Sequence, residues 1–221
     1  MGGERRSNGG RRELAAQVAG ELRAIIANLS EREISDADLG AAAQLGAELR
    51  KRLDGPRRPR WYDGDAMNLA EEGRFAYLDQ SPIRGRLNPI APPLQIEIVE
   101  HPDGTRRVVG SAHLGHAYEG PPHGVHGGWV AALFDELLGA AQGLAEAPGV
   151  TAILRVRFRH LTPVDEDLRL EAWIADQRQR RLVVKATCRA GDTLTADAEG
   201  IFMRVDFNEV NERMRERREE G

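Results

Sequence analysis

The order of predicted elements makes this chain an α+β protein, in which an antiparallel sheet wraps around one long helix and a helical extension comes first. Two strand-like runs precede a long apolar helix, and four more strand-like runs follow it. One face of the helix is too apolar to lie in water, so we expect the six-stranded sheet to curl around it. A single curled layer leaves two strand edges open, which favours pairing with a second copy of the chain.

Length and composition limit the classes of protein that fit. The 221 residues suffice for one domain with a helical extension. The formal net charge of -4 provides no general attraction to nucleic acid. Cys188 is the single cysteine, which excludes an internal disulfide and fits a reducing compartment. No apolar run approaches the roughly 20 residues that cross a bilayer, and residues 1–10 lack the apolar core of a signal peptide. We expect a cytoplasmic protein with no nucleic-acid or membrane partner.

The first quarter of the chain is predicted to be helical. Residues 1–10 are rich in glycine and charge and are expected to be disordered. A helical hairpin extension is expected over residues 11–54, with Ser30 or Ser35 as the cap of its second helix. A Pro/Gly-rich connection follows over residues 55–93. Two apolar stripes predict the hairpin: Leu14, Val18, Leu22, Ile25 and Ile26, then Leu39, Ala43, Leu45, Leu49 and Leu53.

A period of two, which is typical of strands, begins after this connection. Leu94, Ile96 and Ile98 alternate with their neighbours, and an Asp-Gly turn leads to a partner strand. We place the sheet domain at residues 94–207 and a charged C-terminal tail at residues 208–221. The partner strand and the four runs after the helix are 106–114, 151–160, 167–176, 182–189 and 194–205.

Residues 123–139 carry most of the functional information in the sequence. They begin His-Gly-Val-His-Gly-Gly and continue as a helix that we expect from Gly127 to about Ala147, before a Pro-Gly pair. Three- and four-residue spacing predicts that one face of this helix is buried. Its members are Val130, Leu133, Phe134, Leu137, Leu138 and Ala141.

A second stripe of the same helix consists of small residues, apart from Asp135 and Gln142. Glycine inside a helix costs about 1 kcal/mol relative to alanine, so Gly139 suggests that something approaches this stripe closely. The N–H groups of Gly127 and Gly128, at the positive end of the helix, could hold a carbonyl oxygen that becomes negative. Asp135 would add a base or nucleophile for acyl transfer. Spacing alone supports equally a flexible start to a core helix, with Asp135 at its wet edge.

Five segments carry a resemblance to a known family. They are Asn88-Pro89-Ile90-Ala91-Pro92-Pro93-Leu94, Tyr118-Glu119-Gly120-Pro121-Pro122, Val125-His126-Gly127-Gly128, Leu133-Phe134-Asp135-Glu136 and Thr151-Ala152-Ile153-Leu154-Arg155-Val156. The chain resembles the hotdog-fold thioesterases of the phenylacetate-pathway type, within the 4-hydroxybenzoyl-CoA thioesterase superfamily. The resemblance implies a hotdog fold and an acyl-CoA thioesterase that releases a carboxylic acid and free coenzyme A. It also implies an active site shared between two protomers, without a metal or a cofactor other than the coenzyme A of the substrate.

The same resemblance implies roles for individual residues. Asp135 falls where the catalytic carboxylate lies, as general base on water or nucleophile on the thioester. Gly128 or Gly127 would supply the N–H that polarises the thioester carbonyl. His126 would position the loop or contact the thioester. Thr151 matches a hydroxyl that the partner subunit often contributes to orient water.

Some candidate binding residues are less well defined. Several relatives carry Asn or Gln six or seven residues before the histidine, whereas this chain has Glu119 and Gly120 there. Glu119 is either a second carboxylate of the substrate site or a surface loop residue. Trp129 could line the acyl pocket. Arg159 or His160 could reach the phosphates of coenzyme A, although an exposed sheet face explains these residues as well.

Two rival chemistries can be weighed from spacing. Adjacent helical residues point about 100° apart, so Asp135 and Glu136 cannot both face one substrate, and Asp135 is favoured by the small residues around it. Two His-x-x-His pairs would suggest a metal, but no cysteine accompanies them, and strand residues three apart point to opposite faces. We expect no metal at these pairs, His113 with His116 and His123 with His126.

Two other functions remain open beside thioester hydrolysis. One is a hotdog enoyl-CoA hydratase or dehydratase, which the order of His-Gly-Gly before Asp135 disfavours. The other is a non-catalytic acyl-CoA binding protein, which the missing Asn or Gln and the added helices favour. A homodimer and a tetramer both fit, and no motif identifies the acyl group.

Overall fold

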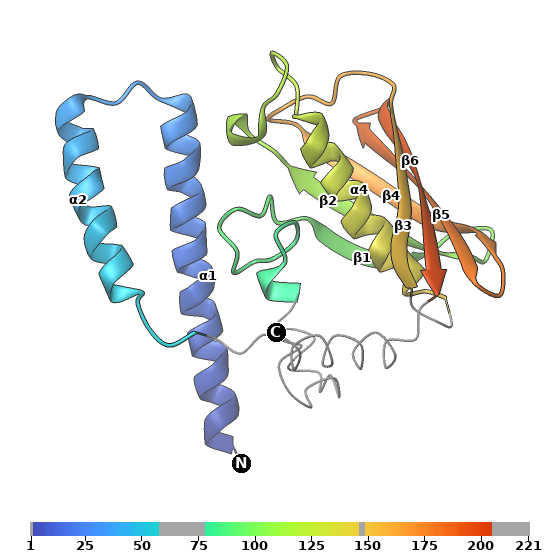
Figure 1. Cartoon of the computed structure of the whole chain (residues 1–221), viewed down its shortest axis with the longest axis horizontal. Coiled ribbons are helices and arrows are strands. Elements are labelled where there is room, and N and C mark those ends of the chain that lie inside the picture. Colours follow the sequence, from blue (N-terminus) through green and yellow to red (C-terminus); the bar gives the residue numbers. More distant parts are fainter. Residues whose placement is uncertain (1, 58–77, 146–148, 205–221) are drawn as a thin grey trace, which may run out of the picture. The chain divides into compact units, whose positions relative to one another are not determined.

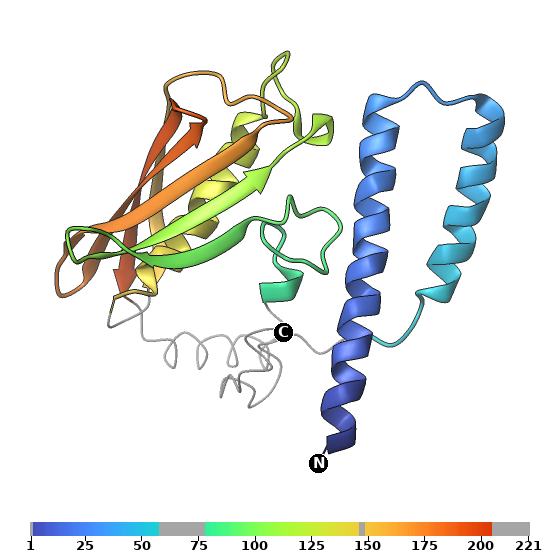
Figure 2. The same cartoon turned by 180° about the vertical axis from the view of Figure 1, so that it is seen from behind.

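A computed structural model describes residues 2–57, 78–145 and 149–204 of the chain. These residues form two compact units, Met1–Pro93 and Leu94–Gly221. Each unit is described by itself (Figures 1 and 2). The predicted tail at 208–221 and most of the predicted connection at 55–93 lie outside the described residues, and those two assignments stay predictions.

The second unit is a six-stranded antiparallel sheet with the order β1-β2-β4-β5-β6-β3. One long helix, α4, lies along one face of the curved sheet (Figure 1). The predicted α+β arrangement is therefore confirmed. The elements are β1 (Gln95–Glu100), β2 (Arg106–His113), the short 3₁₀ helix η1 (His116–Tyr118), α4 (Gly127–Gln142), β3 (Gly149–Phe158), β4 (Asp167–Gln177), β5 (Arg181–Ala190) and β6 (Thr193–Arg204).

Burial of one helix face holds α4 on the sheet. All six predicted members of the apolar stripe are buried. Two glycines of the sheet make room for their side chains. A Cβ at Gly110 would lie 2.8 Å from Leu137 Cδ1, and one at Gly200 would lie 3.2 Å from Leu138 Cδ1. Truncation of one such leucine to alanine is expected to cost about 2–5 kcal/mol of unfolding free energy.

The C-terminal end of α4 differs from the prediction. The helix ends at Gln142, not near Ala147, and its last carbonyls accept hydrogen bonds from the backbone N–H groups of residues 143–145. The Gln142 side chain donates to Gly149 O over 3.0 Å and accepts from Gly149 N–H over 2.9 Å. These bonds join the end of α4 to the start of β3, and a continued helix would carry the chain away from that strand.

The first unit contains the predicted helical hairpin, α1 (Gly2–Glu31) and α2 (Asp36–Arg52). Ser35 caps α2, because its side chain accepts a hydrogen bond from the N–H of Asp38. The structure differs from the expected disorder of residues 1–10, since α1 already begins at Gly2. Extension of an existing helix costs much less than starting one, which explains why the helix continues through the glycines.

The segment after residue 77 packs on α1. Arg12 Nε and Nη2 donate to the two carboxylate oxygens of Asp79 over 2.6 and 2.8 Å. Arg23 donates to the carbonyl of Asn88 over 2.9 Å. Ala16 and Ala19 are buried on the same side of the helix. In the described part of the chain no helix is long and apolar enough to span a membrane.

Candidate active site

The N-terminus of α4 is capped by its own histidine. His126 Nδ1 accepts a hydrogen bond from the Gly128 N–H over 3.0 Å, and the His126 carbonyl accepts from Trp129 and Val130. The Gly128 N–H is therefore occupied within the chain. A ring nitrogen that accepts is unprotonated, so the neutral His126 carries its proton on Nε2.

Gly127 is the better candidate for holding a carbonyl oxygen. Its N–H forms no hydrogen bond with another described residue. A Cβ at Gly127 would lie 3.2 Å from Cζ of Phe158, so the glycine lets this aromatic ring approach the helix end. Of the two predicted donors, geometry thus favours Gly127 over Gly128. Phe158 was not among the residues that the sequence indicated.

Glu119 holds the loop that leads into α4. Its Oε1 accepts from the His123 N–H over 2.6 Å, and its Oε2 pairs with His116 Nδ1 over 3.2 Å. His123 has a φ of 63°, a left-handed conformation that is rare without glycine, and the Glu119 bond stabilises it. These contacts fit the predicted loop role of Glu119, and its substrate-binding role stays a prediction.

Gly120 is needed for the same loop to close. A Cβ there would lie 2.7 Å from Cα of His126, closer than any side chain allows. The His126 N–H donates to the Tyr118 carbonyl over 2.8 Å. The ring of Tyr118 also packs edge-on against Trp129, with ring centroids 4.9 Å apart. Trp129 thus helps to support the loop, together with Tyr118, which belongs to one of the segments that carry the resemblance but had no role assigned to it.

Asp135 and Thr151 meet on the other side of α4. Thr151 Oγ1 donates to Asp135 Oδ1 over 3.2 Å, and both residues are exposed. The resemblance implied a hydroxyl from the partner subunit, whereas here Thr151 reaches Asp135 of its own chain. A β-bulge follows Thr151, so that the next residue paired with β6 is Ile153. The predicted carboxylate and hydroxyl are therefore brought together.

The stripe around Asp135 is open in the single chain. No described atom lies within 4 Å of a Cβ placed at Gly139, so the expected close neighbour is absent from the described part of this chain. Glu136, next to Asp135, is half-buried and has interactions of its own. Asp135 remains the carboxylate that faces open space beside small residues.

The two halves of the candidate site are far apart in one chain. Gly127 and Asp135 are separated by eight residues, or about 12 Å along the helix axis at 1.5 Å per residue. An oxyanion donor and an attacking oxygen must both lie within about 3 Å of one carbonyl group. One copy of α4 cannot place both groups on the same thioester.

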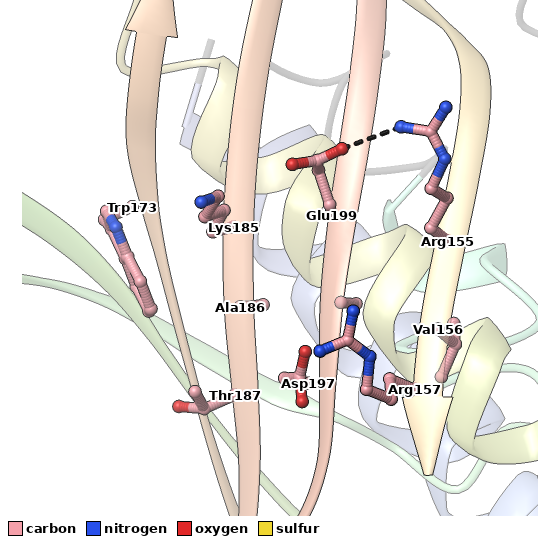
Figure 3. Close-up of a pocket in the computed structure, with 10 residues that line it drawn as sticks. Arg155, Val156, Arg157, Trp173, Lys185, Ala186, Thr187, Asp197 and Glu199 are labelled. Carbon is pink, nitrogen blue, oxygen red and sulfur yellow. Dashed lines mark hydrogen bonds and ion pairs between the residues drawn. The ribbon is translucent and has the colours of Figure 1, made fainter.

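The predicted phosphate-binding residues are partnered elsewhere. Arg159 forms an ion pair with Asp197, and His160 Nδ1 is 2.9 Å from the Leu194 carbonyl. On the outer face of the sheet, Arg155 pairs with Glu199 over 2.8 Å beside a shallow hollow of about 580 Å³ (Figure 3). This face is a charged outer surface, and the structure does not bring its arginines to Asp135.

The histidines do not assemble a metal site. His113 lies 3.0 Å from Asp167, whereas His116 lies between Glu119 and Asp165. Among the described residues there is no group of three or more His, Cys, Asp or Glu side chains that could hold a metal ion. His116 and His123 instead belong to the loop that Glu119 ties together.

Part of the chain is similar in sequence or fold to known thioesterases. Residues 123–196 match the family model described as the thioesterase superfamily. Human acyl-coenzyme A thioesterase THEM5 is 30% identical over 93 residues, 41% of this chain and 38% of that protein, so the chain spans well under half of its length. A thioesterase superfamily protein of known crystal structure is 24% identical, covers 86% of this chain and 90% of its own, and has a TM-score of 0.67.

The structural likeness concerns the fold, which is the predicted hotdog arrangement with its N-terminal helices. The family match begins at His123 and continues through α4, β3, β4 and β5 to the start of β6. It includes the histidine cap, the two glycines, Asp135 and Thr151. Residues 123–196 thus match the thioesterase superfamily, and the sheet and helix have the hotdog fold of the solved structure.

Proposed function

We propose that this protein hydrolyses the thioester of an acyl-coenzyme A to a carboxylic acid and free coenzyme A, with Asp135 as the catalytic carboxylate. The hydrogen bond from Thr151 to Asp135 carries the proposal, because it holds an exposed carboxylate beside a stripe of small residues. The superfamily match and the acyl-coenzyme A thioesterase activity in the name of the human relative support it.

The chemistry requires an attacking oxygen and a stabilised oxyanion. Asp135 either takes a proton from water as the water oxygen attacks the thioester carbon, or attacks that carbon itself. The carbonyl oxygen becomes negative and is held by the Gly127 N–H. The C–S bond then breaks and the coenzyme A thiolate takes up a proton. If Asp135 itself made the attack, water then hydrolyses the mixed anhydride that forms, which releases the carboxylic acid and restores the Asp135 carboxylate. Thr151, which donates to one carboxylate oxygen, orients the carboxylate.

We place the active site between two copies of the chain. The separation of about 12 Å between Gly127 and Asp135 in one helix supports this arrangement. The edge strand β3 supports it as well, since Val150, Ile153 and Phe158 are exposed along it. In a homodimer, Gly127 of one copy would face Asp135 of the other, and the open space at Gly139 would be filled. A tetramer would be built from two such dimers.

The same proposal makes the protein an enzyme that acts in the cytoplasm and needs no metal or organic cofactor. A thioester carries its own activated leaving group, so general-base or nucleophilic catalysis with an oxyanion donor suffices. Coenzyme A enters only as part of the substrate.

The test compares Asp135→Asn with Glu136→Gln, a matched change at the neighbouring helical position. Thiol release is measured on short, long and aromatic acyl-CoAs, and circular dichroism checks folding. We expect Asp135→Asn to lose at least about 10²-fold in kcat, as removal of a general base does, and Glu136→Gln to keep most activity. Hydrolysis by Asp135→Asn at the wild-type rate would refute the role.

One observation favours an alternative function, the binding of acyl-CoA without hydrolysis. Glu119 stands where relatives carry Asn or Gln, and its carboxylate is used by the loop. A chain that lacks this polar group could bind acyl-CoA without cleaving it. Tight binding of a non-hydrolysable thioester analogue, together with no thiol release from any of the acyl-CoAs, would establish that function instead.

A further inference from the structure

The helical hairpin exposes an apolar groove that its own chain leaves open. No residue of α2 is buried, and Leu45 and Leu53 are 67% and 58% exposed. The groove runs between α1 and α2, has a volume of about 980 Å³, and is lined on the α1 side by Leu22 and Ile25. In proteins most of the stability of a helix comes from packing of its apolar side. We therefore expect another helix or protein surface to cover this groove.

The spacing of residues along α2 identifies the kind of partner. Residues 39, 42, 46, 49 and 53 follow one another at intervals of three and four, the pattern of a helix that packs along a second helix. Leucine stands at both ends of this stripe, whereas Ala42 and Gly46 stand in its middle. Small central residues allow two helix axes to approach closely, which favours a helix over a flat surface as the partner.

The charges on α2 identify the partner further. The first turn carries Asp36 and Asp38, and the last turn carries Arg50, Lys51 and Arg52. In the heptad defined by the apolar stripe, the two aspartates and the two arginines occupy the flanking positions that form ion pairs between helices. Asp36, Arg50 and Arg52 form no ion pair with another described residue.

We infer that the groove binds α2 of a second copy of this chain, with the two α2 helices antiparallel around a twofold axis beside Gln44. In this register Leu39 lies opposite Leu49 of the second copy, and Ala42 lies opposite Gly46 of the second copy. The apolar layers and the charges then agree, because the acidic turn of each helix meets the basic turn of the other. A surface that matches itself in this way is typical of a twofold-symmetric interface.

The same register explains why the hairpin stays open. The second α2 helix would lie between α1 and α2, and the two hairpins together would form a four-helix bundle. Leu22 and Ile25, which line the α1 side of the groove, would then contact the incoming helix. The apolar area left exposed by each hairpin is covered by the other.

Cross-linking of the full chain tests this interface. In this register Ala43 occupies a flanking position of the heptad, close to Ala43 of the second copy, whereas Gln44 lies at the level of the twofold axis but on the outer side of α2. Cys188→Ala serves as the background, and single cysteines are introduced by Ala43→Cys and, as the matched control, Gln44→Cys. Two cysteines at position 44 would be about 20 Å apart, since each helix is about 10–12 Å wide. With a short bis-maleimide we expect roughly tenfold more dimer from Ala43→Cys.

Exchange of the charges at the two ends of α2 provides a second test of the interface. Asp36→Arg with Asp38→Arg should reduce the yield of dimer from the cysteine at position 43 several-fold. Addition of Arg50→Asp and Arg52→Asp should restore it, which a defect in helix stability would not do, because those changes also oppose the helix dipole. Circular dichroism confirms that α2 remains helical.

Three results would overturn the inference. Equal cross-linking at positions 43 and 44 would indicate random collision. A cysteine at position 43 that is shielded from a monofunctional maleimide without forming dimer would mean that another part of the same chain covers the groove. A charge exchange that does not restore the yield would exclude the antiparallel register. The readout is independent of thioester hydrolysis, so an inactive chain that cross-links would refute only the proposed function.

Discussion

Thr151 donates a hydrogen bond from Oγ1 to Asp135 Oδ1 over 3.2 Å, and thereby joins the start of β3 to the middle of α4. Seven residues further along the helix, Gln142 clamps Gly149 with two more hydrogen bonds. The first residues of β3 are thus hydrogen-bonded to the second half of α4 at two positions. The position of the carboxylate depends on this alignment as much as on the helix itself.

The first prediction concerns the hydroxyl of Thr151. Thr151→Val keeps the shape of the side chain but removes the donor, so Asp135 loses the group that orients it. We expect kcat for acyl-CoA hydrolysis to fall about tenfold, equivalent to about 1.4 kcal/mol of transition-state stabilisation, with little change in KM. Thr151→Ser retains the donor and should recover most of the rate. Equal losses in both variants would assign Thr151 to packing alone.

The second prediction concerns the histidine cap of α4. His126→Ala removes the acceptor of the Gly128 N–H and should lower the free energy of unfolding by about 0.5–2 kcal/mol, the usual cost of losing an N-cap. His126→Asn provides another short acceptor and should retain most of the stability. Urea denaturation of the three proteins measures the difference. If Asn is no better than Ala, the histidine acts through something other than the cap.

The buried face of α4 and the positions of the strands along the chain could be predicted from the sequence because burial imposes a period. All six residues of the predicted helix stripe are buried, and in β4 the alternation places Leu168, Leu170 and Ala172 inside. These patterns depend only on which side of an element faces the core. They are local properties that a single sequence carries.

Features that depend on contacts distant in the chain could not be predicted in this way. The end of α4 at Gln142 is set by hydrogen bonds to a strand beyond the next turn. The role of Glu119 depends on a left-handed residue, His123, whose conformation no period reveals. Which glycine N–H is left to hold a carbonyl oxygen, that of Gly127 or of Gly128, depends on the orientation of the His126 ring. Each of these requires the folded path of the chain.

The third prediction concerns the pair that holds α1 to the segment after residue 77. Asp79 is nearly buried and accepts two hydrogen bonds from Arg12. Arg12→Ala would leave that carboxylate without its charged partner and should destabilise the first unit by about 1–3 kcal/mol. Arg12→Lys should recover only part of this loss, because an ammonium cannot donate to both oxygens in the same fork geometry. Hydrogen exchange of the α1 amides measures the effect, and unchanged protection in Arg12→Ala would contradict it.

The fourth prediction concerns pH and the only cysteine. Cys188 is buried in β5, and burial raises the pKa of its thiol above the ordinary value, while Thr195 opposes the shift to a smaller extent. As pH rises past the ordinary thiol pKa of about 8.5, the unfolded chain releases this proton while the folded chain keeps it. The stability contributed by the protonated thiol is complete below that pH and is lost as pH rises toward the folded value. Urea denaturation from pH 7 to 10 should therefore show a steeper loss of stability in the wild type than in Cys188→Ala, by up to about 1.4 kcal/mol per pH unit. Parallel curves for the two proteins would mean that the thiol ionises as readily in the folded chain as in the unfolded one.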